Sequence, residues 1–329
     1  MSRGLGDVYK RQVIKLEQNY RSTQTILNAA NAVISNNIGR KSKSLWTDNG
    51  EGEKVNYTLY ENGYDEAEGV ASGIAEYVRD GWNYNDVAIL YRTNAQSRAL
   101  EEKLMIHNIP YKIYGGQNFY QRKEIKDILA YLKTIDNGLD GQAVKRIINV
   151  PKRGIGNTTI DRLQEYADFN DITFWEALVN AKDIDTIKNA ALSKLEPFVD
   201  LIGRLRAKEE FMSLKELAEA VIEDTGYIES LSQNETVEEV EARRENLDEF
   251  INKVVSYEEG CKEAGEEPTL SGLLEEVALI ADIDNLDESE PHVMLMTLHS
   301  AKGLEFPHVY LAGMEAVSYT HLRAHETLA

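Results

Sequence analysis

Residues 293–313 read VMLMTLHSAKGLEFPHVYLAG, and this stretch decides the fold. A short apolar run at 293–296 is followed by a polar loop and then by a second apolar run at 309–311. Short apolar runs separated by polar segments are typical of buried strands in a parallel sheet. The stretch therefore predicts a buried strand, a functional loop and a second buried strand. The polar side chains of the loop include Thr297, His299, Lys302 and Glu305.

A second informative stretch is LEQNYRS, at residues 16–22, and apolar residues precede it. From Thr23 onward, apolar residues recur at the spacing of one helical face. We expect a strand, then a turn that carries Tyr20 and Arg21, then a helix with Ser22 as its N-cap. In open α/β sheets, ligands bind where strands end and helices begin.

Residues 293–313 resemble motif V, and residues 16–22 resemble motif IV, of superfamily 1A DNA helicases of the UvrD/PcrA/Rep type. The resemblance covers about residues 13–315. It implies a fragment of an ATP-dependent DNA helicase or translocase that moves 3′ to 5′. The complete protein would then be an enzyme that hydrolyses ATP.

The same resemblance implies which residues bind ATP. Tyr20 would stack on the adenine, Glu305 would contact the ribose, and Arg21 would reach the γ-phosphate as the catalytic residue. A planar guanidinium can bind two of the oxygens over which phosphoryl transfer spreads charge. Gln18 is the fourth ATP-binding candidate. Without the resemblance, these residues favour a structural interpretation, in which Arg21 pairs with a carboxylate and Tyr20 fills a gap.

The loop that holds triphosphate and magnesium in such motors, G-x-x-x-x-G-K-[ST], is absent, because the sequence contains no Gly-Lys pair. Residues 65–68, DEAE, imitate the acidic DExx motif, but polar residues precede them, so they predict the first turn of a helix. We therefore expect ATP and Mg²⁺ to be bound mainly by a missing N-terminal motor domain, which would be a partner of this chain. This chain alone is predicted not to hydrolyse ATP.

Two loops are candidates for contact with single-stranded DNA. Arg92 and Asn94 follow an apolar run and precede a helical pattern, a position that suits phosphate and base contacts. Asn94 could instead cap the helix. Arg98 either contacts the single strand or lies on a solvated helix face. Thr297 and His299 match helicase positions that face the DNA strand, although a lone histidine is more often structural.

Residues 114–127, YGGQNFYQRKEIKD, resemble motif IVa. Phe119 and Tyr120 either stack on bases or pack in the core, and we assign Phe119 to packing. Arg122 is a candidate DNA contact.

Residues 150–159, VPKRGIGNTT, resemble the hairpin of helix-hairpin-helix modules. In that resemblance, backbone N–H groups and the following helix N-terminus grip duplex phosphates without reading sequence. Duplex or fork DNA is the expected partner. The candidate residues are Lys152, Arg153, Gly154, Ile155, Gly156 and Thr158.

A net charge of -20 argues against a generally basic DNA-binding surface, so DNA contacts must be local. Basic residues gather at 122–126 and 146–153, whereas acidic residues gather at 235–249 and 258–290. One cysteine, Cys261, excludes an intramolecular disulfide and suits a reducing compartment. We expect a cytoplasmic protein with no membrane span and no metal site of its own.

Alternating strands and helices predict an α/β protein in which a parallel-sheet domain is interrupted by an all-helical insertion. The resemblance implies that the sheet domain is RecA-like and corresponds to domain 2A, and that the insertion corresponds to domain 2B. The sheet domain is predicted at 13–120 and 291–315, and the duplex-binding insertion at 121–290. Residues 1–12 and 316–329 are predicted to be non-native tails. Further strands are predicted at 55–60, 87–91 and 111–114, and helices at 65–79 and 95–107.

A hypothesis of a different class remains open. The chain would be a non-catalytic DNA- or partner-binding module, in which the helical insertion acts on an α/β scaffold. In that case residues 121–290 alone would bind fork DNA with full affinity. The helicase hypothesis requires the sheet domain for single-strand affinity.

Overall fold

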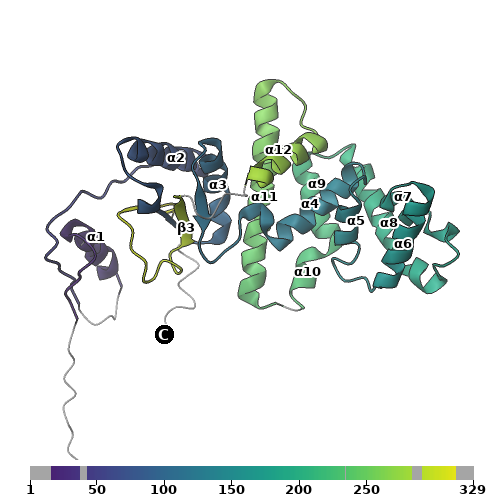
Figure 1. Cartoon of the computed structure of the whole chain (residues 1–329), viewed down its shortest axis with the longest axis horizontal. Helices are drawn as coiled ribbons and strands as arrows, with labels where there is room; N and C mark the ends of the chain where they lie inside the picture. The colour runs from purple at the N-terminus through teal and green to yellow at the C-terminus, as the bar shows by residue number, and fades with distance from the viewer. Residues whose placement is uncertain (1–15, 38–42, 234, 284–290, 316–329) are drawn as a thin grey trace, which may run out of the picture. The chain divides into compact units, whose positions relative to one another are not determined.

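The computed structural model describes residues 16–37, 43–233, 235–283 and 291–315, and its elements are labelled in Figure 1. The chain forms two compact units, Met1–Tyr60 and Glu61–Ala329.

The first unit contains one helix, α1 (Gln24–Ser35), among its described residues. The predicted helix is confirmed, but its N-cap is Thr23 and not Ser22. Leu27 is the buried residue of its apolar face. An isolated parallel bridge joins Gln18 to Trp46. Of the strand end predicted at Val13, Ile14 and Leu16, the first two residues lie outside the described residues, and Leu16 has no strand assignment.

The strand predicted at 55–60 is wrong, because these residues have no strand assignment. Val55, Tyr57 and Leu59 are 58%, 82% and 82% exposed. An alternating sequence forms a strand only where a neighbouring strand accepts its backbone hydrogen bonds and its apolar face is covered. The alternation alone gives neither condition.

The second unit contains a four-stranded parallel sheet, which confirms the predicted α/β class. Its spatial order is β2-β3-β1-β4. In this order, β3 from residues 293–297 lies between two strands formed about 200 residues earlier, so the chain leaves the sheet and returns to its middle. The strands are β1 (Val87–Tyr91), β2 (Tyr111–Ile113), β3 (Val293–Thr297) and β4 (His308–Leu311).

Strand β4 differs from the prediction of a second buried strand. It lies at the edge of the sheet, and Val309 and Leu311 are 44% and 52% exposed. A continuous apolar run is buried on both faces only when layers cover both faces. The sequence shows the run and does not show the position of the strand in the sheet.

Helices α2 (Gly63–Arg79) and α3 (Ser97–Ile106) pack with the sheet and form its hydrophobic cluster. We call these helices and the four strands the sheet part. Asp65 and Glu66 lie in the first turn of α2, where Asn62 accepts a hydrogen bond from the Asp65 N–H, so the helical interpretation of residues 65–68 is confirmed. The fully buried members of the cluster include Ile74, Val87, Ile89, Tyr91, Val293 and Leu295.

Residues 123–283 are predominantly helical, and we call them the helical part. Its helices are α4 (Lys123–Asp136), α5 (Gly141–Ile147), α6 (Asn157–Asn170), α7 (Phe174–Val179), α8 (Asn189–Glu209), α9 (Leu214–Thr225), α10 (Tyr227–Leu231), α11 (Val237–Ala264) and α12 (Leu270–Ile283). Short 3-10 turns occur at η1 (Tyr84–Asp86), η2 (Asn94–Gln96), η3 (Phe119–Gln121) and η4 (Ala181–Asp183).

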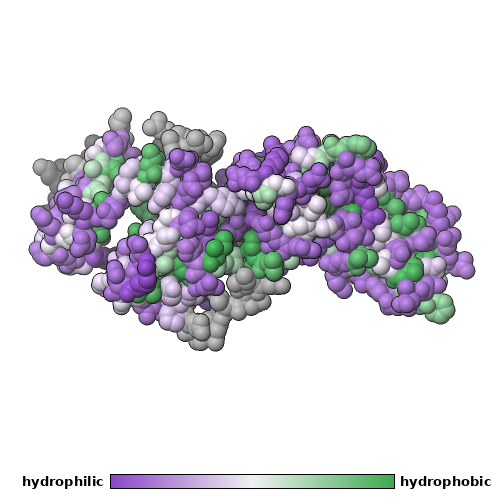
Figure 2. Space-filling model, turned by 90° about the horizontal axis from the view of Figure 1, so that it is seen from above, coloured by the Kyte–Doolittle hydropathy of each residue, from purple (hydrophilic) through white to green (hydrophobic). Residues whose placement is uncertain are grey.

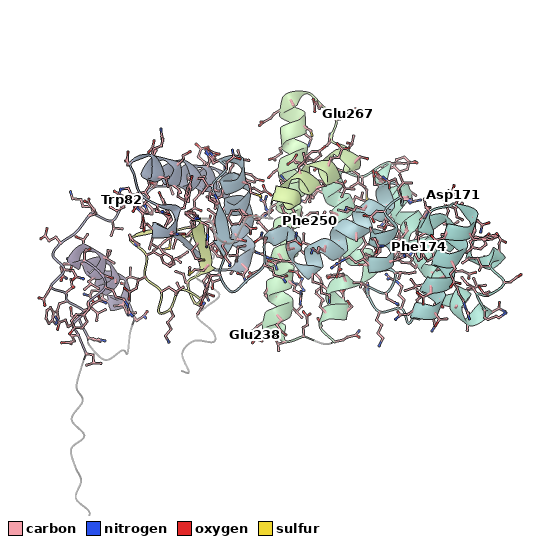
Figure 3. The ribbon with its side chains drawn as sticks, in the orientation of Figure 1. Trp82, Asp171, Phe174, Glu238, Phe250 and Glu267 are labelled. Carbon is pink, nitrogen blue, oxygen red and sulfur yellow. The ribbon has the colours of Figure 1, made fainter. Side chains whose placement is uncertain are left out.

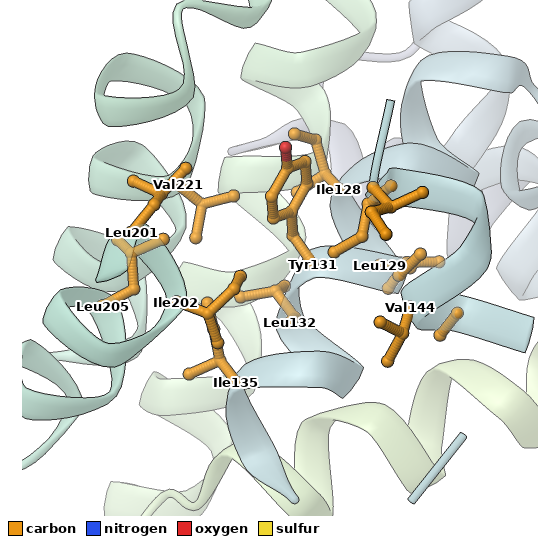
Figure 4. Packing of buried hydrophobic residues seen from close by; sticks show 14 of the residues in the cluster. Ile128, Leu129, Tyr131, Leu132, Ile135, Val144, Leu201, Ile202, Leu205 and Val221 are labelled. Carbon is orange, nitrogen blue, oxygen red and sulfur yellow. The ribbon is translucent and has the colours of Figure 1, made fainter. Parts of the chain in front are cut away.

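The helical part has its own hydrophobic cluster, centred on α4. Figure 4 shows residues of α4 packed against α5, α8 and α9, among them Ile128, Tyr131, Leu132, Ile135, Val144, Leu201, Ile202, Leu205 and Val221. Hydrophilic residues cover most of the visible outer surface in Figure 2. The predicted domain boundaries, with the sheet domain at 13–120 and 291–315 and the helical insertion at 121–290, stay a prediction.

The longest described helix, α11, begins at a capping box of Thr236 and Glu239 and ends at Gly265, whose φ is +75°. Figure 3 shows Glu238 and Glu267 near its two ends, with Phe250 between them. Phe250 is fully buried in the helical cluster. Within the described ranges, none of the helices has both the length and the apolar character needed to cross a membrane.

The ring of His308 at the start of β4 makes stability depend on pH. Its centroid lies 4.4 Å from the ring of Tyr77 and 4.8 Å from that of Tyr310, and burial lowers the pKa of His308. The unfolded chain takes up this proton at a higher pH than the folded chain does, so stability falls as pH drops below about 6.5. We predict that His308→Phe reduces the loss of unfolding free energy between pH 7 and pH 5 in urea titrations. Equal pH slopes in wild type and His308→Phe would contradict the prediction.

Candidate functional site

The turn at 19–22 in the first unit is fixed by the side chain of Asn19. Its Oδ1 accepts hydrogen bonds from the backbone N–H groups of Arg21 and Ser22, at 2.9 and 2.8 Å. The backbone of Asn19 also donates to the carbonyl oxygen of Trp46 at 2.8 Å. A short polar side chain that binds the backbone two and three residues ahead stabilises a turn locally. The turn therefore has a fixed backbone.

Tyr20 lies on this turn with 76% of its surface exposed. Its hydroxyl donates to Gln18 Oε1 at 2.9 Å, and Gln18 Nε2 donates to Asp48 at 2.9 Å. The ring face is accessible for stacking, and the exposed Arg21 follows it. The interpretation that Tyr20 fills a gap in the core does not fit this exposure. The ATP-binding roles of Gln18, Tyr20 and Arg21 stay predictions.

In the second unit, strands β1, β2 and β3 end at Tyr91, Ile113 and Thr297, and we call this the carboxyl edge of the sheet. Because the strands are parallel and neighbouring, the loops that follow them meet there. The register pairs Tyr91 with Thr297 and Ile113 with Leu295.

The loops at this edge are in close contact. Arg92 Nη1 lies 3.0 Å from His299 Nδ1, which joins the β1 loop to the β3 loop. A Cβ placed on Gly116 would lie 3.9 Å from Asn94 Oδ1, and one on Gly115 would lie 3.8 Å from Ser300 Oγ. The structure thus brings together the predicted DNA residues Arg92, Asn94, Thr297 and His299.

The β1 loop is held by Gln96, a residue that the sequence did not single out. Gln96 Oε1 accepts hydrogen bonds from the backbone N–H groups of Arg92 and Thr93, at 2.9 and 3.1 Å. Asn94 is exposed and begins η2, whose N-cap is Thr93. The interpretation of Asn94 as a helix cap is therefore wrong. The Asn94 side chain lies at the surface, beside Gly116 of the loop that follows β2.

The β3 loop is a compact turn. Thr297 Oγ1 lies 3.0 Å from Ser300 Oγ and accepts from the Ser300 N–H at 3.3 Å. Gly303 has a φ of +93°, a conformation that L side chains rarely adopt, and so permits a tight turn here. Glu305 is exposed further along the loop, before β4. Its ribose contact stays a prediction.

Arg98 is buried, so the interpretation that it lies on a solvated helix face is wrong. Its guanidinium donates to Glu249 at 2.8 Å and to Glu102 at 3.0 Å, and Nη1 also donates to the Tyr64 hydroxyl at 2.9 Å. Burial alone would lower the pKa of Arg98, but the carboxylates of Glu102 and Glu249 more than reverse this, and the pKa is raised. Arg98 therefore joins α3 of the sheet part to α11 of the helical part.

Arg122 is also largely buried. Nη1 donates to Asn246 at 2.8 Å, Nη2 donates to the Ser97 hydroxyl at 2.8 Å, and the guanidinium lies 5.0 Å from the Phe119 ring centroid. Burial lowers the pKa of Arg122. These contacts are within the protein and give Arg122 a structural role in this arrangement. Its direct contact with DNA stays a prediction.

Phe119 is 0% exposed and Tyr120 is 4% exposed. The predicted packing role of Phe119 is confirmed, and Tyr120 packs as well, with its hydroxyl donating to Glu102 at 2.6 Å. Neither ring is accessible to a base. The two aromatic residues of the motif IVa stretch are therefore core residues and do not stack on bases in this arrangement.

The hairpin at 150–156 connects α5 to α6 in the helical part. Asn149 fixes it, because Nδ2 donates to the Ile155 carbonyl oxygen at 2.5 Å and Oδ1 accepts from the Ile155 N–H at 3.0 Å. Ile155 is buried, and Gly154 has a φ of +71°. Arg153 turns inward, where Nη2 donates to the Tyr131 hydroxyl at 2.6 Å. Ile155 and Arg153 therefore shape the hairpin from within.

The outer face of this hairpin is open. Gly156 is the N-cap of α6, supplies no side-chain cap, and has nothing within 4 Å of its Cβ position. Thr158 and Lys152 are exposed. Lys194 of α8 donates to the Gly154 carbonyl oxygen at 2.8 Å and so adds a cation that sequence spacing did not predict. A free helix N-terminus beside ammonium groups favours a phosphate.

Among the described residues, no group of three or more His, Cys, Asp or Glu side chains is arranged to hold a metal ion. His321 and His325 lie outside the described residues.

The parallel sheet, the loops at its carboxyl edge and the helical insertion define the class of RecA-like α/β domains with a helical insertion. The chain matches the UvrD-like helicase C-terminal domain model over residues 14–327, and it belongs to that family. The match runs into residues 316–329, and the prediction that the two tails are non-native stays untested.

Relatives agree with this assignment. The chain is 48% identical over 318 residues to "ATP-dependent DNA helicase PcrA" of Staphylococcus aureus strain Mu50, covering 97% of this chain and 43% of that protein. It is 46% identical over 318 residues to the protein of the same name from Staphylococcus epidermidis strain ATCC 12228, again covering 97% of this chain and 43% of the relative. The chain thus spans less than half the length of these relatives. The predicted UvrD/PcrA-type resemblance is confirmed.

The burial of Arg98 predicts a large effect on stability. Arg98→Met leaves Glu102, which is 4% exposed, without its closest cation, although Lys253 Nζ lies 3.6 Å away. We expect a loss of about 3 kcal/mol of unfolding free energy, the lower end for breaking a buried ion pair. Urea denaturation followed by circular dichroism measures it. Arg244→Met, at a site 49% exposed, is the control and is expected to change stability by less than about 0.5 kcal/mol. Equal midpoints for the two variants would contradict the assignment.

Proposed function

We propose that this chain is part of an ATP-dependent 3′-to-5′ DNA helicase or translocase and supplies part of its single-strand track, residues of its nucleotide site and a duplex-binding surface. The convergence of the β1, β2 and β3 loops at the carboxyl edge carries the proposal. These loops bring an arginine, an asparagine, a histidine and a threonine together at the place where parallel sheets bind ligands. Because DNA is the proposed substrate, we place the activity in the cytoplasm.

The chemistry at the carboxyl edge suits a polynucleotide. A guanidinium carries only donors, so Arg92 donates towards His299 Nδ1 in this contact. The remaining guanidinium donors can bind a phosphate, while the exposed Asn94 offers both a donor and an acceptor to a sugar or base. Thr297, the last residue of β3, is the fourth proposed single-strand residue at this edge. Backbone contacts of this kind hold a strand without selecting its sequence.

We propose that the ATP-binding residues are Gln18, Tyr20, Arg21 and Glu305. An exposed tyrosine ring fits an adenine, a guanidinium fits the γ-phosphate, and a carboxylate fits the ribose hydroxyls. The described residues hold no metal-binding cluster, and the sequence contains no P-loop. We propose that Mg²⁺ and the remaining phosphates would be held by a second motor domain that acts together with this one, where the metal would neutralise charge that develops during phosphoryl transfer.

For duplex or fork DNA, we propose the outer face of the hairpin at 150–156, with Lys152, Gly154, Gly156, Thr158 and Lys194. The open N-terminus of α6 and two ammonium groups favour a backbone phosphate. Ile155 and Arg153 support the hairpin from inside.

The alternative of a non-catalytic binding module draws support from the separate hydrophobic cluster of the helical part. Its distinguishing expectation is that substitutions at the carboxyl edge leave fork-DNA affinity unchanged. The helicase proposal expects Arg92→Ala to weaken single-strand binding.

The purified chain is predicted not to hydrolyse ATP, because its sequence lacks the G-x-x-x-x-G-K-[ST] loop that holds magnesium and the β- and γ-phosphates. A phosphate-release assay with single-stranded DNA in excess measures this. Nucleotide binding without turnover is expected, and Tyr20→Ala is expected to weaken it. ATP turnover that Arg21→Ala abolishes would overturn the prediction.

Removing a cation from the hairpin face is predicted to weaken duplex binding. At 0.1 M salt, Lys152→Ala and Lys194→Ala should each reduce affinity for a blunt duplex roughly five- to tenfold and reduce the salt slope by about 1. Fluorescence anisotropy at several salt concentrations measures both quantities. Lys215→Ala removes the same charge from α9, where Lys215 pairs with Glu219 at 3.6 Å, and serves as the control. Equal losses in all three variants would indicate a general charge effect instead of a site.

A further inference from the structure

Tyr114 is an exposed aromatic residue at the carboxyl edge. It directly follows β2, and its N–H donates to the Leu295 carbonyl oxygen at 2.8 Å, so its backbone continues the pairing with β3. Its side chain is 47% exposed, whereas Tyr111 and Ile113 on the preceding strand are 7% exposed. The backbone of Tyr114 is therefore fixed while its ring is accessible.

The register places Tyr114 beside the proposed single-strand residues. Ile113 pairs with Leu295, so Tyr114 lies opposite Met296, one residue before Thr297. Neighbouring strands are about 4.8 Å apart, so the ends of β2 and β1 are separated by roughly 10 Å across β3. The next residue, Gly115, approaches Ser300 of the β3 loop. Tyr114 thus lies one strand away from Thr297 and two strands away from Arg92.

The other aromatic residues near this edge are not accessible. Phe119 and Tyr120 are buried in the helical cluster, and Tyr91 is 0% exposed in the sheet cluster. Trp82, which is exposed, precedes β1 and therefore lies towards the opposite, amino edge. Figure 3 shows Trp82 near the end of α2. Among the described residues of the sheet part, Tyr114 combines an exposed ring with a position at the carboxyl edge.

Phosphate-binding side chains alone leave the bases of a single strand in water. Proteins that bind single strands without sequence preference combine a cationic track with aromatic rings on which bases stack. Every base has a flat face, so one ring serves any sequence. The two glycines after Tyr114 have no side chains, which leaves the approach to the ring on that side unobstructed.

We propose that Tyr114 is a base-stacking residue, and that a nucleobase of the bound single strand lies on its ring while Arg92 and His299 engage the neighbouring backbone. This assignment rests on the proposed function of the carboxyl edge and adds to it a subsite for the base. The stacking partner is any of the nucleobases, and the hydroxyl of Tyr114 is not required.

The experiment uses the full chain and oligo-dT carrying one 2-aminopurine, whose fluorescence is quenched when it stacks on a ring. Tyr114→Leu keeps an apolar side chain and removes the flat face, whereas Tyr114→Phe keeps the ring. We expect Tyr114→Leu to bind about tenfold more weakly and to lose the quenching, and Tyr114→Phe to retain both. Phe211→Ala, at an 86% exposed position in the helical part, is expected to behave as wild type. Unchanged urea midpoints show that both Tyr114 variants remain folded.

The outcomes separate this inference from the proposed function. If Tyr114→Leu binds and quenches as wild type does, while Arg92→Ala weakens binding, the stacking assignment is wrong and the single-strand track stands. If wild type does not bind the oligonucleotide, the track itself is wrong and the stacking assignment falls with it. Loss of binding in Tyr114→Phe as well would also overturn the assignment, because it would make the hydroxyl the essential group.

Discussion

Strand β3 pairs with β2 on one side and with β1 on the other, and the sheet part depends on this double pairing. Without β3, the strands β1 and β2 have no common neighbour. The same pairing aligns the ends of three parallel strands, so that Arg92 reaches His299 across a sequence separation of 207 residues. Stability and the candidate site therefore share one origin, which is the insertion of a late segment into the middle of a sheet.

Much of this arrangement follows from the sequence, and the exceptions have physical reasons. The strands at 87–91 and 293–297 are predicted because both faces of a central parallel strand are covered, which leaves a continuous apolar run. The strand at 111–113 lies at an edge and alternates, with Lys112 exposed between Tyr111 and Ile113. The strand predicted at 55–60 fails because alternation does not supply a pairing partner. The exposure of β4 is not predicted because the run at 309–311 is as apolar as a central strand would be.

For the site, sequence locates the loops but not the direction of each side chain. Four arginines lie in or beside the candidate DNA-binding stretches of the sequence, namely Arg92, Arg98, Arg122 and Arg153. Their environments in the structure differ because their partners come from distant segments. The partners of Arg98 and Arg122 include Glu249 and Asn246 on α11, more than a hundred residues away. Burial of a charge requires such partners. Lys194 was missed for the same reason, because it acts on the backbone of a hairpin 40 residues away. Gln96 was missed although its contacts are local, since it forms a capping box with Thr93 and accepts from the Arg92 N–H within the same loop.

The order of the strands has a consequence for synthesis. As the chain leaves the ribosome, β1 and β2 emerge first, the helical part follows, and the strand that separates them emerges last. The helices of the helical part all precede β3 in the chain and share their own hydrophobic cluster, so they can pack around α4 while the sheet is still unfinished. During that interval β1 and β2 each carry a row of unsatisfied backbone groups, which are templates for pairing with another chain. Translation that stops before residue 293 would release a polypeptide with a helical core and two uncovered strand edges.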